Sequence, residues 1–161
     1  MAVAILKDTH ELLAKRIKQI REEIEKNKKD IQEAVSHGDL SENAEYDSAK
    51  ERQSMLHYKL NQLQMYMNVE IFDENDINTE VVSFGTSVKI KNKKNGEVQQ
   101  YNLVGPAEYE LENYPDIMTY TSPLAKALIG KEVGETAEIK KPDKHLQFEV
   151  MEINSVLEEE E

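Results

Sequence analysis

The chain of 161 residues has no cysteine and no tryptophan. The lack of cysteine excludes a disulfide scaffold and a zinc site with thiolate ligands, and it is typical of a reducing compartment. No apolar run approaches the roughly 20 residues that a membrane span needs, and the N-terminus has no charged-then-apolar signal pattern. We therefore expect a soluble, cytoplasmic protein that does not bind a membrane.

Basic residues are scarce. The chain has 20 Lys and Arg against 32 Asp and Glu, which gives a formal net charge of −12. Because phosphate binding depends on clustered Lys and Arg, this acidity argues against a surface that wraps nucleic acid over most of the chain. Residues 1–72 carry 11 basic and 13 acidic side chains, so most of the excess negative charge lies in the second half. A polyanion-facing surface is expected in the first half, and the second half is expected to meet a protein.

Familiar catalytic motifs are absent as well. The four histidines show no metal-ligand spacing such as HExxH: His10, His37, His57 and His145. The chain has no glycine-rich phosphate loop, and the order of its residues supports no Ser-His-Asp or Cys-His set. The sequence therefore indicates no active site of these classes.

Apolar residues at alternating steps of three and four predict two long helices in the first half. One seam contains Leu13, Ile17, Ile20, Ile24, Asn27, Ile31 and Ala34, and the other contains Tyr46, Ala49, Gln53, Leu56, Leu60, Leu63 and Met67. The capping-box spacing of Asp8 and Glu11 predicts the start of the first helix, and His37-Gly38 predicts its end. Because the turn between the seams is short, we predict an antiparallel coiled-coil hairpin on the order of 40 Å long.

The second half changes its period. The acidic segment 73–78 is interpreted as a linker, and alternating residues predict strands at 86–90, 98–104, 137–140 and 146–153. Asn95-Gly96 predicts a hairpin turn. Ser122-Pro123 predicts the start of a short helix that Gly130 ends. The predicted fold class is α+β, with a hairpin domain over residues 1–74, a small sheet domain over 75–157 and an acidic tail over 158–161.

The residues with the most distinctive chemistry lie at the predicted tip of the hairpin, over residues 38–46. Asp39 and Glu42 are three positions apart, so their carboxylates can project from one face. Two carboxylates at a protruding end suit magnesium, which prefers oxygen ligands and keeps several waters. The same spacing is also a capping box that would stabilise the start of the second helix. The spacing alone leaves both interpretations open.

The segment GDLSENAEY at 38–46, followed by Ala49-Lys50-Glu51, resembles the tip of the bacterial GreA/GreB transcript-cleavage factors. The stretch SPLAKALIG at 122–130 is similar to the other signature of that family. The resemblance covers about residues 5–155 and contains two independent motifs in the right order. It implies an FKBP-like fold for the second domain.

The resemblance also implies a function, which is to assist bacterial RNA polymerase rather than to act as an enzyme alone. The second domain would dock at the rim of the polymerase secondary channel, with Ser122 and Pro123 in the docking loop, while the hairpin enters the channel. Asp39 and Glu42 would then help to hold the second catalytic magnesium while the polymerase cleaves the backtracked nascent RNA near its 3′ end. The isolated protein would carry no magnesium, and we expect a monomer.

Other interpretations remain open for several residues. Lys50 and Arg52 can contact the extruded RNA or can be solvated helix surface. Val35 departs from the family, which often has arginine at that position, and this bears on the strength of RNA contact. Ser122 and Pro123 also have a local explanation as the first residues of a helix.

Two other functions also fit the pattern. One is a relative that enters the same channel and modulates transcription without cleavage. The other is a coiled-coil adaptor that clamps a different protein between its arms.

Overall fold

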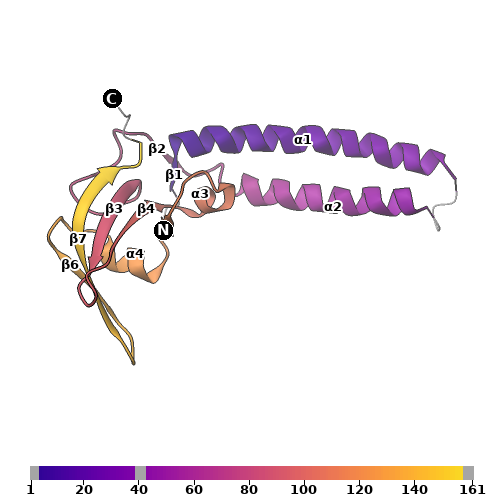
Figure 1. The fold of residues 1–161 in the computed structure, drawn as a ribbon. Helices are drawn as coiled ribbons and strands as arrows, with labels where there is room; N and C mark the ends of the chain where they lie inside the picture. The colour runs from indigo at the N-terminus through magenta and orange to yellow at the C-terminus, as the bar shows by residue number, and fades with distance from the viewer. Residues whose placement is uncertain (1–3, 39–42, 158–161) are drawn as a thin grey trace. The chain divides into compact units, whose positions relative to one another are not determined.

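The computed structural model describes residues 4–38 and 43–157 of the chain (Figure 1). The described residues fall into two compact units. One unit is His10–Asn68, and the other contains the residues before His10 together with those from Val69 onward. Within the described ranges, no helix combines the length and the apolar character that crossing a bilayer requires.

The unit His10–Asn68 is an antiparallel pair of long helices, α1 (Lys7–Ser36) and α2 (Ala44–Gln64), which lie side by side (Figure 1). The seams expected from the sequence face the partner helix, because every seam residue is buried or half-buried. The best-buried apolar members are Leu13, Ile17, Ile24, Ala34, Leu56 and Leu63, all at most 8% exposed. The predicted hairpin is therefore confirmed.

The two ends of α1 differ in how well the sequence predicted them. The helix begins at Lys7, directly after the strand β1 (Ala4–Leu6), so the expected start at an Asp8 capping box is wrong. Asp8 lies in the first turn, where its Oδ1 accepts the Thr9 N–H at 2.9 Å and its Oδ2 accepts the Tyr114 hydroxyl. The expected end is confirmed, because α1 stops at Ser36 and Gly38 has φ +119°, a conformation that favours glycine.

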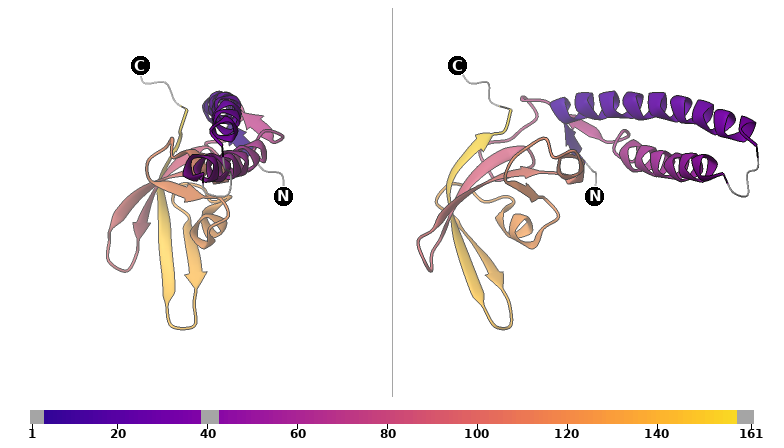
Figure 2. Two further views of the ribbon diagram at one scale, coloured as in Figure 1. Left: turned by 90° about the vertical axis from the view of Figure 1, so that its right-hand side faces the viewer. Right: turned by 45° about the vertical axis from the view of Figure 1, so that its right-hand side comes forward.

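The second unit is built on a five-stranded sheet in the order β5-β4-β3-β7-β6. Its strands are β3 (Thr86–Asn92), β4 (Val98–Val104), β5 (Ile117–Thr119), β6 (Thr136–Lys140) and β7 (His145–Ser155). All neighbours are antiparallel except β4 and β5, and Figure 2 shows the two long hairpins β3–β4 and β6–β7. The four predicted strands and the turn at Gly96, whose N–H donates to the Asn92 carbonyl at 2.8 Å, are confirmed.

A short helix, α4 (Pro123–Leu128), packs its buried residues into the core of the sheet. This core includes Val88, Ile90, Leu103, Ala125, Leu128 and Val150, each at most 1% exposed. A helix on a mostly antiparallel sheet, together with the helical hairpin, confirms the predicted α+β fold class.

Four further elements were not expected from the sequence, and the strand β5 given above is one of them. Strand β1 pairs in parallel with β2 (Glu70–Phe72), and a helix, α3 (Pro106–Leu111), follows β4. Leu6 and Ile77 pack with Val104 in a second apolar cluster. For this reason the N-terminal strand and the segment 69–78 belong to the sheet unit, whereas the sequence grouped residues 1–74 with the hairpin. The expected acidic tail at 158–161 lies outside the described residues.

Glu108 holds β1 against the start of α3. Its side chain is 0% exposed, its Oε1 accepts the Gly105 N–H at 2.9 Å and its Oε2 accepts the Leu6 N–H at 3.4 Å. Burial raises the pKa of Glu108 above its ordinary value, although these donors and Thr9 oppose the rise. The carboxyl is therefore a structural clamp inside the sheet unit.

Candidate functional site

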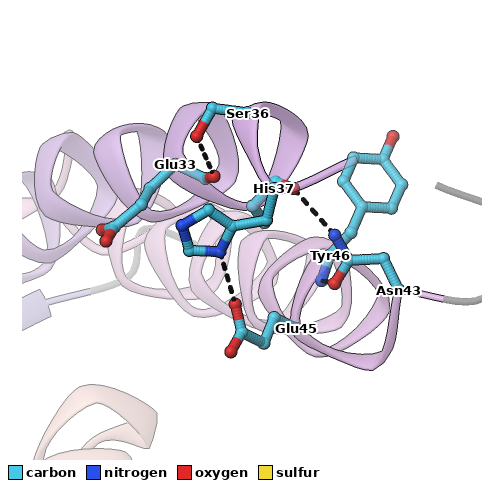
Figure 3. A network of polar contacts seen from close by, with 7 residues as sticks. Glu33, Ser36, His37, Asn43, Glu45 and Tyr46 are labelled. Carbon is cyan, nitrogen blue, oxygen red and sulfur yellow. Dashed lines mark hydrogen bonds and ion pairs between the residues drawn. The ribbon is translucent and has the colours of Figure 1, made fainter. Parts of the chain in front are cut away.

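The tip of the hairpin is bounded by the end of α1 and the start of α2. Asp39 and Glu42, the two carboxylates singled out from the sequence, lie outside the described residues, as does Ser41. The described residues nearest to them are Gly38 and Asn43. The surroundings of the candidate site are therefore defined by the two helix ends (Figure 3).

Asn43 caps the start of α2. It has an extended backbone, and its Oδ1 accepts the Tyr46 N–H at 3.1 Å. Its Nδ2 donates to the Ala34 carbonyl of α1 at 2.7 Å, so the same side chain also joins the two helices. Asparagine is among the preferred residues at this position because its side-chain oxygen satisfies a free N–H of the first turn.

The position of this cap bears on one of the two interpretations of the tip, the capping box. Helix α2 begins at Ala44, after Glu42, and Asn43 supplies its cap. A capping box formed by Asp39 and Glu42 would need the helix to begin directly after Asp39, so that interpretation is wrong.

Charged side chains also meet across the tip. His37 Nδ1 lies 3.3 Å from Glu45 Oε2, and the pair connects the end of α1 with the first turn of α2 (Figure 3). Both side chains are more than half exposed, so the contact contributes little to stability. Glu45 and Asp47 lie in the first turn of α2, where the helix dipole favours negative charge. Among the described residues, no group of three or more His, Asp or Glu side chains is arranged to hold a metal ion.

Lys50 and Arg52 do not share a face of α2. Residues two apart on a helix point in directions roughly 200° apart. Lys50 is exposed and its Nζ donates to Gln53 Oε1 at 2.9 Å. Arg52 instead lines a hollow of about 420 Å³ together with Asn27 and Asp30. RNA contact by these two residues stays a prediction. In the structure, Lys50 and Arg52 lie on different sides of α2.

A larger groove lies along the hairpin, farther from the tip, with a volume of about 980 Å³. Ile17 and Met67 contribute apolar surface to it. Its charged lining residues are Lys18, Arg21, Glu22, Glu25, Lys26 and Lys29, so cations outnumber anions there. The sequence analysis missed this groove. The available signal was the spacing of Lys18 and Arg21, which places both on one side of α1.

Ser122 and Pro123 form the start of α4. Ser122 Oγ accepts the Ala125 N–H at 3.2 Å, and Pro123 is the first helical residue. Their local explanation as helix-start residues is therefore confirmed, while contact with a polymerase stays a prediction.

Comparison with known proteins shows similarity along both units. The family model described as "Transcription elongation factor, N-terminal" matches residues 3–69, and that described as "Transcription elongation factor, GreA/GreB, C-term" matches residues 77–155.

Individual relatives agree with the family models. A transcription elongation factor GreA of Flavobacterium johnsoniae is 40% identical over 146 residues, which is 85% of this chain and 91% of the relative. That of Flavobacterium psychrophilum is 41% identical over 149 residues, or 87% and 93% of the two chains. The solved structure of the GreA factor homolog 1 of Thermus thermophilus is 23% identical, with a TM-score of 0.44 over 96% of this chain and 100% of that chain.

Proposed function

Because the chain belongs to the GreA/GreB family of transcription elongation factors, we propose that it enters the secondary channel of bacterial RNA polymerase and stimulates cleavage of backtracked nascent RNA. The hairpin is the part that enters the channel, and the tip carboxylates act at the polymerase active site. The protein is a factor that assists the polymerase in the cytoplasm, as a monomer, and is not itself a nuclease.

The observation that carries this proposal is the cap of α2. Asn43 supplies the N-cap hydrogen bond of α2, so the N-cap role does not fall to Asp39 or Glu42. Two acidic side chains only three positions apart in the sequence repel each other because they carry like charges. A cation bound in the complex with polymerase would remove that repulsion and explain their presence.

The residues fit magnesium by the chemistry of their donors. Asp39 and Glu42 offer the carboxylate oxygens that magnesium prefers, and they supply only part of the six ligands that the ion needs. The ion would therefore be held jointly with groups of the polymerase. When bound, it would activate a water for attack on a phosphodiester. The task of this chain is to bring the two carboxylates to that place.

Other residues have supporting tasks. Ser122, which is half-buried, and Pro123, which is exposed, would contact the rim of the channel from the start of α4. Lys50 would contact the extruded RNA near its 3′ end from one side of α2, and Arg52 would act from another side. Each such cation adds affinity that falls as the salt concentration rises.

The test uses backtracked elongation complexes assembled with 3′-labelled RNA and a matched bacterial polymerase. The wild-type protein is expected to increase magnesium-dependent release of short 3′ fragments. The double variant Asp39→Asn/Glu42→Gln should reduce release to the rate of polymerase alone. A matched control, Glu45→Gln/Asp47→Asn, removes the same charge from the first turn of α2 and should keep the wild-type rate.

Two results would contradict the proposal. If the wild-type protein binds polymerase but does not increase RNA release, it modulates transcription from the channel without cleavage. If it does not bind polymerase at all in a pull-down, an adaptor function is favoured instead.

A further inference from the structure

Asn27 is a polar residue in the seam of α1, and it is almost fully buried. Its side chain is 1% exposed, and its Nδ2 donates to the Ala49 carbonyl of α2 at 3.0 Å. Its Oδ1 has no hydrogen-bond partner among the described residues. A buried acceptor without a partner destabilises the fold, whereas leucine at this position would bury apolar surface. What asparagine provides here is the bond to the other helix.

Asn43 makes the reciprocal bond from α2 to α1. Its Nδ2 reaches the Ala34 carbonyl, just as the Nδ2 of Asn27 reaches the Ala49 carbonyl. Both acceptors belong to alanines, whose small side chains let an asparagine reach the backbone. The two bonds are compatible with a single alignment of the helices. On α1, Ala34 lies about two helical turns after Asn27. On α2, Asn43 lies nearly the same distance before Ala49.

The apolar residues of the seams do not fix this alignment by themselves. They recur every three to four residues, so a slip of α1 along α2 by one seam step again places apolar residues opposite each other. Leu56, Leu60 and Leu63 would simply exchange partners. Such a slip would break both asparagine bonds and leave the Asn27 amide buried without partners, which opposes it.

The alignment also decides which residues form the turn that connects the two helices. When two antiparallel helices slip against each other, the centre of the turn between them moves along the sequence by half the slip. In the alignment observed, α1 ends at Ser36 and α2 begins at Ala44. A slip by one seam step would therefore move the turn away from the residues that now occupy it.

We propose that Asn27 and Asn43 are positioning residues that fix the alignment of α1 against α2 and so decide which residues form the tip. The inference rests on the proposed function, in which Asp39 and Glu42 act from that tip. The asparagines act through the alignment and contact neither RNA nor metal.

The first variant is Asn27→Leu, which suits an apolar seam and should keep the helix content, measured by circular dichroism. Its maximal stimulation of RNA cleavage should fall by about tenfold to a hundredfold, because misplacement of reacting groups by about 1 Å has effects of that size. The concentration for half-maximal stimulation should not change, since the sheet unit is untouched. Asn61→Leu, the same replacement at an exposed position of α2, should behave as wild type.

The alignment itself can be measured without polymerase. Because the chain has no cysteine, cysteines introduced at the exposed positions Glu23 and Lys59 can carry a pair of nitroxide labels. A slip by one seam step moves the labels along the helix axis by about 5 Å, which pulsed electron paramagnetic resonance resolves. We expect a single distance in the wild type and a shifted or broadened distribution in Asn27→Leu.

A second variant separates the two tasks of Asn43. Asn43→Ser keeps an oxygen that can cap α2 but is too short to reach the Ala34 carbonyl. It should shift the distance and lower the maximal cleavage in the same way as Asn27→Leu.

The inference is overturned if both variants keep the wild-type distance, whatever happens to cleavage. It is also overturned if the distance shifts while stimulation of cleavage stays at the wild-type level. Failure of the proposed function looks different, because the wild type would then stimulate no more than Asp39→Asn/Glu42→Gln.

Discussion

Replacement of Glu108 tests the clamp between β1 and α3. The carboxyl accepts the N–H groups of Gly105 and Leu6 at 2.9 and 3.4 Å, and all three residues are buried. Glu108→Ala leaves both donors without an acceptor. An unsatisfied buried group costs about 1–3 kcal/mol, and the longer bond contributes less, so we expect a loss of about 3 kcal/mol in the free energy of unfolding.

The raised pKa of Glu108 adds a pH dependence with a definite sign. A carboxyl whose pKa is higher in the folded protein than the ordinary value near 4.5 favours folding when it is protonated. This contribution is present below about pH 4.5 and is lost as the pH rises through the folded pKa. Glu108→Gln, which stays neutral, should therefore gain stability relative to wild type as the pH rises above about 4.5.

The assay is urea unfolding followed by tyrosine fluorescence, at several pH values, for wild type, Glu108→Ala and Glu108→Gln. Glu110→Gln, at an exposed glutamate on the same helix, is the matched control and should stay within about 0.5 kcal/mol of wild type. A loss below about 0.5 kcal/mol for Glu108→Ala, or a Glu108→Gln difference that does not change with pH, would refute the reasoning.

Three further changes test the packing of each unit. Leu56→Ala removes a seam side chain that is 4% exposed and should destabilise the hairpin by about 2–4 kcal/mol, seen as earlier thermal loss of helical circular dichroism. Ser122→Ala should cost about 1 kcal/mol in urea unfolding because α4 loses its cap, whereas Ser122→Asp should not. Gly85→Ala should lower the melting temperature, because Gly85 has φ +88° and an added Cβ would lie 2.8 Å from Ile77 Cγ1; an unchanged melting temperature would contradict this.

Much of the fold could be predicted because periodic patterns persist over long segments. The seams of α1 and α2 repeat over many turns, and the Asn95-Gly96 pair marks a turn with a specific backbone requirement. Strands β1 and β2 have three residues each, which is too short for alternation to be visible. Their pairing depends instead on the buried contacts of Leu6 with Ile77 and Val104.

The candidate site was predictable in its residues and less so in its geometry. The spacing of Asp39 and Glu42 fits both a metal site and a helix cap, and only the position of Asn43 shows that the cap is supplied elsewhere. Lys50 and Arg52 are neighbours in sequence, but the helix turns them to different surfaces. Asn27 was visible as an interruption of the seam, whereas its partner, the Ala49 carbonyl, belongs to the backbone and leaves no mark on the sequence.

The pairing of β1 with β2 has a consequence for the order in which the chain folds during synthesis. The first strand leaves the ribosome before the hairpin, yet its partner follows the hairpin, so β1 must wait for more than 60 residues to emerge. The helices α1 and α2 need only contacts close in sequence and can form meanwhile. Once they are paired, the ends of the intervening segment have already been brought near each other. Folding of the hairpin therefore removes most of the entropic cost of closing the loop between β1 and β2.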